Sequence, residues 1–260
     1  MTSAPPLNLL DEALGFLSGG GGGGGRMILV EDCVETTGAF ILHHLLKRSL
    51  SPHSSDVVVF LSFAHPFSHY DRILRKMGCN LVMQRDNKRL LFFDMLMLDR
   101  LDRDKGKTSA DLLLALYGKV QKAVEVCSSP VDTRRITIII DDVSLMEVDA
   151  NGSTNLVLDF LHYCCSLTAQ FGCSLITLNH DDVYSTMDRP TLLLQLEYLA
   201  DVVIKVEPLV TGPATDVHGQ LTVLNKGLQD GPGKSRNKVN NFQFRIKDSF
   251  VEYFYPGNRS

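Results

Sequence analysis

The chain has 260 residues, of which 44% are apolar, and its formal net charge at pH 7 is −4. This composition can bury a sizeable core, which excludes an intrinsically disordered protein and predicts one main folded domain. The acidic balance argues against a free-standing nucleic-acid-binding protein, because affinity for phosphates depends on clustered lysine and arginine side chains.

Signals for export and for membrane insertion are both missing from the pattern. The N-terminus lacks the charged and apolar regions of a secretion signal, and no apolar run approaches about 18 residues, so we expect neither secretion nor a membrane span. The six cysteines form no CxxC pair. Such spacing indicates reduced thiols rather than a disulfide frame, so we expect a cytoplasmic and nuclear protein.

A run of seven glycines, Gly19 to Gly25, divides the chain into an N-terminal segment with its tether, 1–25, and a domain, 26–260. Glycine runs do not pack and behave as flexible tethers. Before the tether, leucines recur at helical spacing, at Leu7, Leu10, Leu14 and Leu17. This segment is too short to fold alone, so it either docks, on its own core or on a neighbour, or is a disordered tail.

After the tether, apolar runs alternate with amphipathic stretches. Continuous Val, Ile and Leu runs are typical of parallel strands that are covered on both faces, and the alternation predicts right-handed βαβ units. The predicted strands are 27–30, 56–63, 90–93, 136–140, 174–178 and 202–206. The predicted helices are 36–49, 67–77, 109–126, 154–171 and 191–199.

The C-terminal part changes style. Residues 219–225 and 241–255 alternate like antiparallel strands, and the second run predicts a hairpin that turns at Asp248 and Ser249. The expected fold class is therefore α/β, a mostly parallel sheet flanked by helices and extended by C-terminal antiparallel strands.

The first strand, loop and helix have the layout of a phosphate-binding P-loop. The working motif, G-x-x-x-x-G-K-[ST], supplies backbone N–H groups, a lysine for the outer phosphates and a hydroxyl for magnesium. In this chain the two glycine positions hold Asp32 and Thr37, the lysine position holds Gly38 and the hydroxyl position holds Ala39. The residues of this degenerate P-loop are Asp32, Glu35, Thr36, Thr37, Gly38 and Ala39.

The charges at this position oppose a bound phosphate. A nucleoside triphosphate would meet Glu31, Asp32 and Glu35, and each pair of like charges costs about 3 to 4 kcal/mol at 4 to 6 Å and an effective dielectric constant near 20. One hypothesis is that the carboxylate of Glu35 or Asp32 itself occupies the anion position at the helix N-terminus. The alternative is that these are solvated turn acids.

Two short strings imitate a P-loop elsewhere. DKGKT ends at Thr108 and GPGKS ends at Ser235, but both lack the first glycine of the motif and neither follows a parallel strand. Thr108 or Ser109 is better interpreted as the cap of the helix that follows, with Asp111 in its first turn.

The strand at 136–140 ends in two acids, Asp141 and Asp142, which gives it the form of a Walker B element. In such an element Asp141 would hold magnesium through water. Aspartate is also common at the ends of parallel strands because it begins turns, and we favour that interpretation. Asn179 and His180 end the next strand, where such folds sense bound phosphate, although a polar loop start is the simpler interpretation.

Other constellations predict little chemistry. His65 and His69, and His162 and Cys165, lack further ligands at metal spacing, so structural roles are expected, with no metal site and no catalytic residue. One local excess of basic residues could contact RNA phosphates or be a solvated loop. Its residues are Lys226, Lys234, Arg236 and Lys238.

Several strings, taken together and in this order, resemble the motifs of the Elongator complex protein 6 family. They run from Leu7 to Tyr255 and are LNLLDEAL, TTGAFILHHLL, FSHYDRILRKMG, IIIDDVSLM, VLDFLHYC, DVHGQLTVL and FQFRIKDSFVEYF. The chain departs from the family pattern chiefly in its glycine run. The resemblance implies a RecA-like fold that has lost its P-loop, with no catalytic activity and no cofactor.

The resemblance also implies partners. It implies a hetero-hexameric ring with two related subunits, Elongator complex proteins 4 and 5, that belongs to Elongator, binds tRNA and supports modification of the wobble uridine. The loops where RecA-like rings meet nucleic acid, 143–155 and 181–190, are acidic here, so we assign them no tRNA contact. Two alternatives remain: an ATPase subunit completed by its neighbours, and a RecA relative that acts alone as a homomer.

Overall fold

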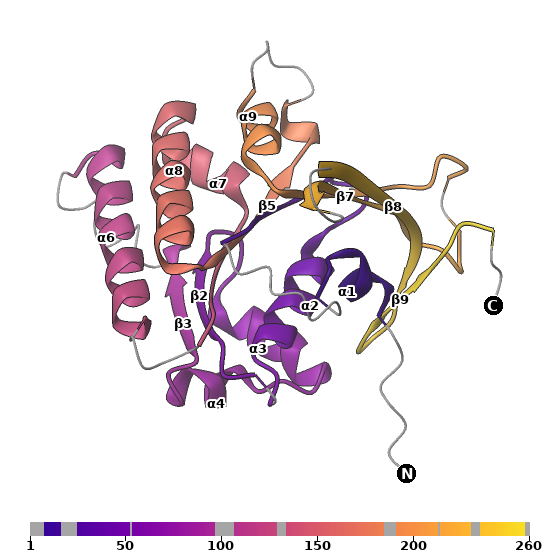
Figure 1. Ribbon diagram of the computed structural model, residues 1–260, viewed down its shortest axis with the longest axis horizontal. Helices are drawn as coiled ribbons and strands as arrows, with labels where there is room; N and C mark the ends of the chain where they lie inside the picture. Colours follow the sequence, from indigo (N-terminus) through magenta and orange to yellow (C-terminus); the bar gives the residue numbers. More distant parts are fainter. Residues whose placement is uncertain are drawn as a thin grey trace.

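A nine-stranded sheet organises the part of the chain that the structure describes (Figure 1). The computed structural model describes residues 8–16, 25–52, 54–96, 107–128, 134–184, 191–212, 214–229 and 235–257. The strand order is β3-β2-β4-β5-β1-β6-β7-β8-β9. Most of the glycine run, and the glycines of both P-loop imitations, lie outside the described residues.

The six predicted parallel strands are confirmed, with ends that differ by one or two residues. Five are almost wholly buried, as expected of apolar runs covered on both faces. Their bounds are β1 Met27–Asp32, β2 Val57–Ser62, β3 Leu90–Asp94, β4 Ile136–Asp141, β5 Ser174–His180 and β6 Val202–Glu207.

Helices cover both faces of this sheet (Figure 1). One apolar cluster joins the sheet to α1 Leu9–Ala13, α2 Ala39–Ser49, α3 Phe67–Lys76 and α4 Leu81–Asp86. A second cluster on the opposite face involves α6 Ser109–Cys127, α7 Val143–Asp149, α8 Thr154–Phe171 and α9 Leu192–Leu199. Within the described residues, no helix is both long and apolar enough to cross a membrane.

The predicted cap of α6 is confirmed, and α8 also ends by local capping chemistry. Thr108 and Asp111 form a reciprocal capping box at the start of α6, and Gly172 ends α8 with a left-handed backbone. The predicted start of α2 at residue 36 is wrong, because Cys33 and Thr36 close a turn through a backbone hydrogen bond of 3.0 Å. The helix begins at Ala39, after the N-cap Gly38. Helices α4 and α7 were not predicted.

The antiparallel extension consists of β7 Gly219–Gln229, β8 Ser235–Ile246 and β9 Val251–Phe254. The hairpin between β8 and β9 is confirmed: Ile246 pairs with Val251, and the N–H of Lys247 donates to the carbonyl of Phe250 at 2.9 Å. This places Asp248 and Ser249 at the turn. Strand β7 runs four residues beyond its predicted end at 225.

The N-terminal helix α1 docks on its own chain. Leu10 and Leu14 are buried against the cluster that contains α2. Asp11 pairs with His44 at 2.9 Å and with Arg48 at 2.8 Å, both on α2. The side-chain amide of Asn225 donates to the carbonyl of Ala13 at 2.8 Å, which ties α1 to β7. The two outer leucines of the predicted stripe, Leu7 and Leu17, lie outside the described residues.

The docking of α1 predicts a stability effect. Leu10→Ala removes a wholly buried side chain, and we expect a loss of about 2 to 4 kcal/mol in the free energy of unfolding, measured by urea denaturation. The exposed Leu114 on α6 is the control, and Leu114→Ala should change the value by less than about 0.5 kcal/mol. Equal effects of the two substitutions would contradict the docking.

Candidate functional site

The loop between β1 and α2 places a carboxylate where a P-loop would hold phosphate. Asp32, which is 2% exposed, ends β1, and its Oδ2 accepts a hydrogen bond from the N–H of Gly38 at 2.6 Å. Gly38 is the N-cap of α2 and offers no side chain of its own, so Asp32 satisfies the helix N-terminus and its dipole. Of the two acids considered for this position, Asp32 occupies it and Glu35 is exposed.

Gly38, at the P-loop lysine position, is tightly packed against its neighbours. A Cβ atom there would lie 3.0 Å from Cγ1 of Val30 and 3.2 Å from Cβ of Asp32. The neighbouring Thr37 is exposed, and its hydroxyl accepts from the N–H of Ala39 at 3.2 Å. The loop is therefore packed around its own carboxylate.

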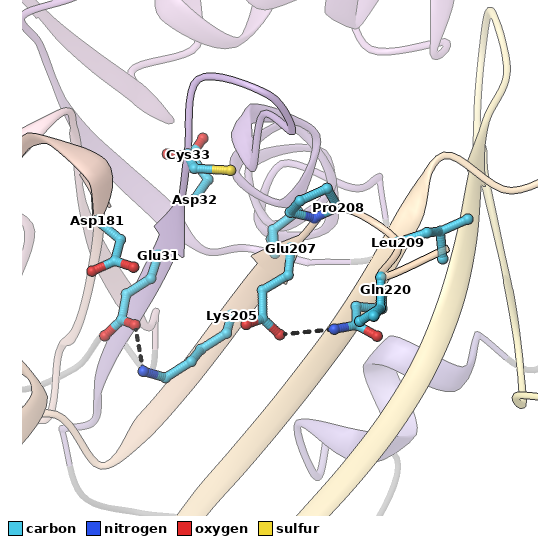
Figure 2. Close-up of a pocket in the computed structure, with 11 residues that line it drawn as sticks. Glu31, Asp32, Cys33, Asp181, Lys205, Glu207, Pro208, Leu209 and Gln220 are labelled. Carbon is cyan, nitrogen blue, oxygen red and sulfur yellow. Dashed lines mark hydrogen bonds and ion pairs between the residues drawn. The ribbon is translucent and has the colours of Figure 1, made fainter. Parts of the chain in front are cut away.

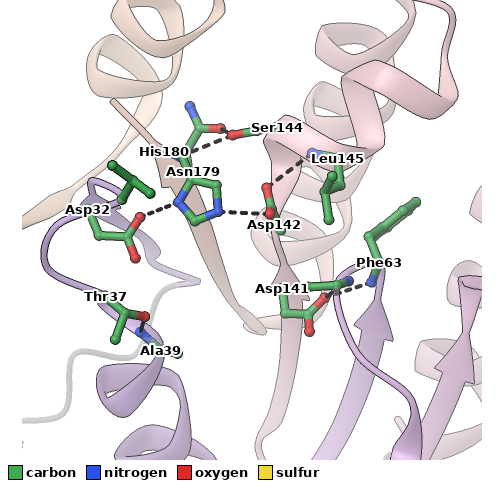
Figure 3. A network of polar contacts seen from close by, with 12 residues as sticks. Asp32, Thr37, Ala39, Phe63, Asp141, Asp142, Ser144, Leu145, Asn179 and His180 are labelled. Carbon is green, nitrogen blue, oxygen red and sulfur yellow. Dashed lines mark hydrogen bonds and ion pairs between the residues drawn. The ribbon is translucent and has the colours of Figure 1, made fainter. Parts of the chain in front are cut away.

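His180 joins Asp32 to a second carboxylate, that of Asp142 (Figure 3). The Nδ1–H of His180 donates to Oδ1 of Asp32, and its Nε2–H donates to Oδ2 of Asp142 at 2.9 Å. These two hydrogen bonds raise the pKa of His180 to about 10, and the bond to Asp142 contributes more than the bond to Asp32. The imidazole is thus protonated at neutral pH, and we call this arrangement the Asp32–His180–Asp142 bridge.

Asp142 also sets the start of α7. Its backbone has a φ of 75°, in the left-handed region that is uncommon for residues other than glycine. Its Oδ1 accepts from the N–H of Leu145 at 3.0 Å, while Oδ2 accepts from His180. The cap and the ion pair together hold this unfavourable backbone conformation in place.

Asp141, the Walker B-like residue, turns toward the end of β2. Its Oδ1 accepts from the N–H groups of Phe63 at 2.6 Å and Ala64 at 3.2 Å, and its Oδ2 accepts from the Ser62 hydroxyl at 3.0 Å. Burial raises the pKa of Asp141 to about 7, with a smaller contribution from the charge of Asp142. Both carboxylate oxygens are therefore engaged within the chain.

Asn179 and Ser144 complete the polar network (Figure 3). The Ser144 hydroxyl donates to Oδ1 of Asn179 at 2.6 Å and accepts from the backbone N–H of His180 at 3.0 Å. Reasoning from the sequence missed these roles of Ser144 and His180. A signal was present, because Asp32 and His180 are partners in the register of β1 and β5, but it depends on knowing that these two strands are neighbours.

An open hollow of about 340 Å³ lies beside this network, at the carboxyl ends of β1 and β6 (Figure 2). Lys205 on β6 pairs with Oε2 of Glu31 at 2.9 Å and with Glu197 at 2.6 Å. Burial is the main cause that raises the pKa of Glu31 to about 7. The lining also includes Asp32, Cys33, Asp181, Val206, Glu207, Pro208, Leu209, Val210 and Gln220.

The basic residues singled out in the sequence do not form one described cluster. The amine of Lys226 donates to the carbonyl of Glu197, whereas Lys238 on β8 is exposed. Lys234 and the side chain of Arg236 lie outside the described part of the structure.

The histidines lie in apolar and aromatic surroundings. The rings of His65 and His69 stack with centroids 4.0 Å apart, and burial lowers the pKa of nearby His43 to about 4. Cys165 contacts Met27, whereas His162 is exposed. Among the described residues, no group of three or more His, Cys, Asp or Glu side chains could hold a metal ion.

The bridge predicts that His180 stabilises the fold. His180→Gln leaves Asp32 and Asp142 buried without their cation, and we expect a loss of about 2 to 3 kcal/mol in urea denaturation. This is below the range for a fully buried pair because His180 is partly exposed. The control is His162→Gln on the exposed face of α8, for which no measurable loss is expected.

The bridge also predicts the pH dependence of this contribution. The pKa of His180 rises from an ordinary 6.5 to about 10 on folding, so its stabilisation is complete below pH 6.5 and is lost as the pH rises through 10. The difference in unfolding free energy between wild type and His180→Gln should shrink over this window. An NMR titration that gives the His180 imidazole a pKa near 6.5 would contradict the bridge.

Comparison with known proteins identifies the fold and the family. A KaiC-like protein from Pyrococcus horikoshii superposes with a TM-score of 0.61 at 10% identity, covering 89% of this chain and 90% of that one, so the fold is RecA-like. Elongator complex protein 6 of Xenopus laevis is 29% identical over 85% of this chain and 87% of its own length. The human protein of the same name is 27% identical over 86% of this chain and 88% of its own length.

The family model described as Elongation complex protein 6 matches residues 18–248, which is most of the chain. The match includes β1, the loop that carries Asp32, the two acids after β4, and His180. The chain therefore belongs to the Elongator complex protein 6 family.

Proposed function

We propose that this chain is a non-catalytic subunit of the Elongator complex. Its RecA-like domain would take part in a hetero-hexameric ring with two related subunits, Elongator complex proteins 4 and 5. The assembled ring would bind tRNA and support modification of the wobble uridine, in the cytoplasm and the nucleus. Family membership supports the place in Elongator, and the geometry at α2 supports the absence of catalysis.

The observation that carries the non-catalytic role is the carboxylate of Asp32 at the N-terminus of α2. A nucleoside triphosphate would need the same N–H group that Asp32 engages at 2.6 Å. It would also need a cation, but the imidazolium of His180 is already shared between two carboxylates. Displacing Asp32 would expose phosphates to the acids around them, at about 3 to 4 kcal/mol for each close pair.

The residues present therefore do not fit a nucleotide and its magnesium ion. Asp141, which would hold the ion through water, accepts three hydrogen bonds from the end of β2 and the loop after it. A lysine at Gly38 would require neighbouring side chains to shift, since a Cβ atom there would be 3.0 Å from Val30. We assign no catalytic step to this site.

The proposed contribution to RNA binding is shared with partners. The formal net charge of −4 opposes independent binding of tRNA. The candidate contacts are Lys226, Lys234, Arg236 and Lys238, and of these Lys238 has an exposed, described side chain. The ring would then bring Lys238 next to basic surfaces of its neighbours.

Co-expression tests the assembly. We expect this chain, produced with the two other small subunits, to form a complex whose native mass corresponds to a hetero-hexamer. Produced alone, it should be poorly soluble or self-associated. A stable homomer that binds neither partner would contradict the proposal. It would favour the alternative in which this chain is a RecA relative that acts alone.

The same complex separates the scaffold from an ATPase completed by neighbouring subunits. Asp141→Asn, confirmed to assemble by native mass, should leave ATP hydrolysis by the ring unchanged within about twofold. A loss of hydrolysis of tenfold or more, which is typical when a residue contributes to the transition state, would favour the ATPase.

The exposed Lys238 predicts a tRNA effect. Lys238→Glu in the assembled ring should weaken tRNA binding several-fold and reduce the dependence of log Kd on log salt by about one unit, as expected for the loss of one phosphate contact. Lys119→Glu on the exposed face of α6 makes the same charge change and is the control. Filter binding at several salt concentrations measures both, and equal slopes would contradict the contact.

A further inference from the structure

The hollow at the carboxyl ends of β1 and β6 has an excess of negative charge. Four carboxylates and one ammonium group line it, from Glu31, Asp32, Asp181, Glu207 and Lys205. We call this region the acidic hollow, and Figure 2 shows its charged side chains around the ends of the two strands. Asp32 is neutralised by His180, but the cation of Lys205 is divided between Glu31 and Glu197.

Glu31 carries an acceptor without a donor. The residue is 3% exposed, and its Oε2 pairs with Lys205, but its Oε1 is buried and accepts no hydrogen bond from the described chain. Buried polar atoms in folded proteins are almost always satisfied, and an orphan acceptor indicates a missing partner. Since the side chain lines the hollow, a donor that enters the hollow is the natural partner.

Two further acids at the hollow are exposed, namely Asp181 and Glu207. Glu207 accepts a long hydrogen bond of 3.3 Å from the amide of Gln220. Both carboxylates therefore retain acceptor capacity on the solvent side. An incoming cation would meet exposed acids first and the buried oxygen of Glu31 last.

Exposed apolar side chains occur at this charged centre and next to its residues in the sequence. The three most exposed large apolar residues among those described are Val210, Val34 and Tyr198, at 93%, 89% and 87%. Val210 lines the hollow, Val34 follows the lining residue Cys33, and Tyr198 follows Glu197, the partner of Lys205. An exposed apolar side chain beside a charged centre suits a protein partner, whereas an RNA backbone would be repelled by the acids.

We propose that the acidic hollow receives an arginine side chain from a neighbouring protein chain of the assembled complex. This rests on the function proposed above. A guanidinium group offers five donors in a planar fork, which can satisfy Oε1 of Glu31 and bind the carboxylate of Asp181 or Glu207. The neighbouring chain would cover Val210 at the same time.

Charge reversal on the assembled complex tests this inference. Asp181→Lys, Glu207→Lys and the double variant change exposed residues, so the fold should be retained, and thermal unfolding checks it. The matched control is Asp159→Lys on the exposed face of α8. Each complex with the two partner subunits is diluted stepwise, and mass photometry follows the fraction that stays assembled.

The expected result is that each reversal raises the concentration of half-dissociation at least tenfold and that the control stays within twofold. Wild-type assembly should also weaken with added salt more steeply than the double variant. If the wild type assembles and the double variant has a concentration of half-dissociation within twofold of the wild-type value, the arginine site is overturned and the proposed function stands. If the wild type does not assemble with these subunits, both are overturned.

Discussion

The carboxyl edge of the sheet depends on one ionic arrangement, in which a protonated histidine holds two buried carboxylates. His180 at the end of β5 pairs with Asp32, which satisfies the N-terminus of α2, and with Asp142, which caps α7. Two strand ends and two helix starts are thereby connected by side chains alone. In a nucleotide-binding relative of this fold, ligand and metal would provide comparable links only while bound. Here the links are made by side chains of the chain itself and need no ligand.

The remaining buried acids of this edge are kept apart by separate partners. Asp141 accepts from the backbone after β2, and Glu31 pairs with Lys205 on the other side of β1. Burial raises the pKa of both groups to about 7 even though donors or a cation lie beside each, so their charged forms are costly. Among the described residues of this edge, the cations of His180 and Lys205 are each paired with two carboxylates.

The sheet could be predicted from the sequence because its strands are continuous apolar runs, and the caps at Thr108 and Gly172 follow local rules. The site could be predicted only in part. An acid at the start of α2 was one of two hypotheses, and the helix start was misjudged because its cap comes from Asp32, six residues earlier. Helix α7 follows an aspartate with a left-handed backbone, which composition does not signal. The role of His180 depends on the order β4-β5-β1, in which neighbours are distant along the chain.

A site closed by its own side chains changes what the surface around it can do. Nucleotide-dependent motion needs loops that differ between bound and free states, and here the loop at Asp32, the start of α7 and the end of β5 are held by the same three residues. Surfaces built on these elements are therefore preorganised, which reduces the entropy lost when a partner binds. The apolar side chains that stand in solvent at this edge, Val34 and Val210, then have a physical reason to be there. A rigid fold can expose apolar area for one partner without rearranging to hide it.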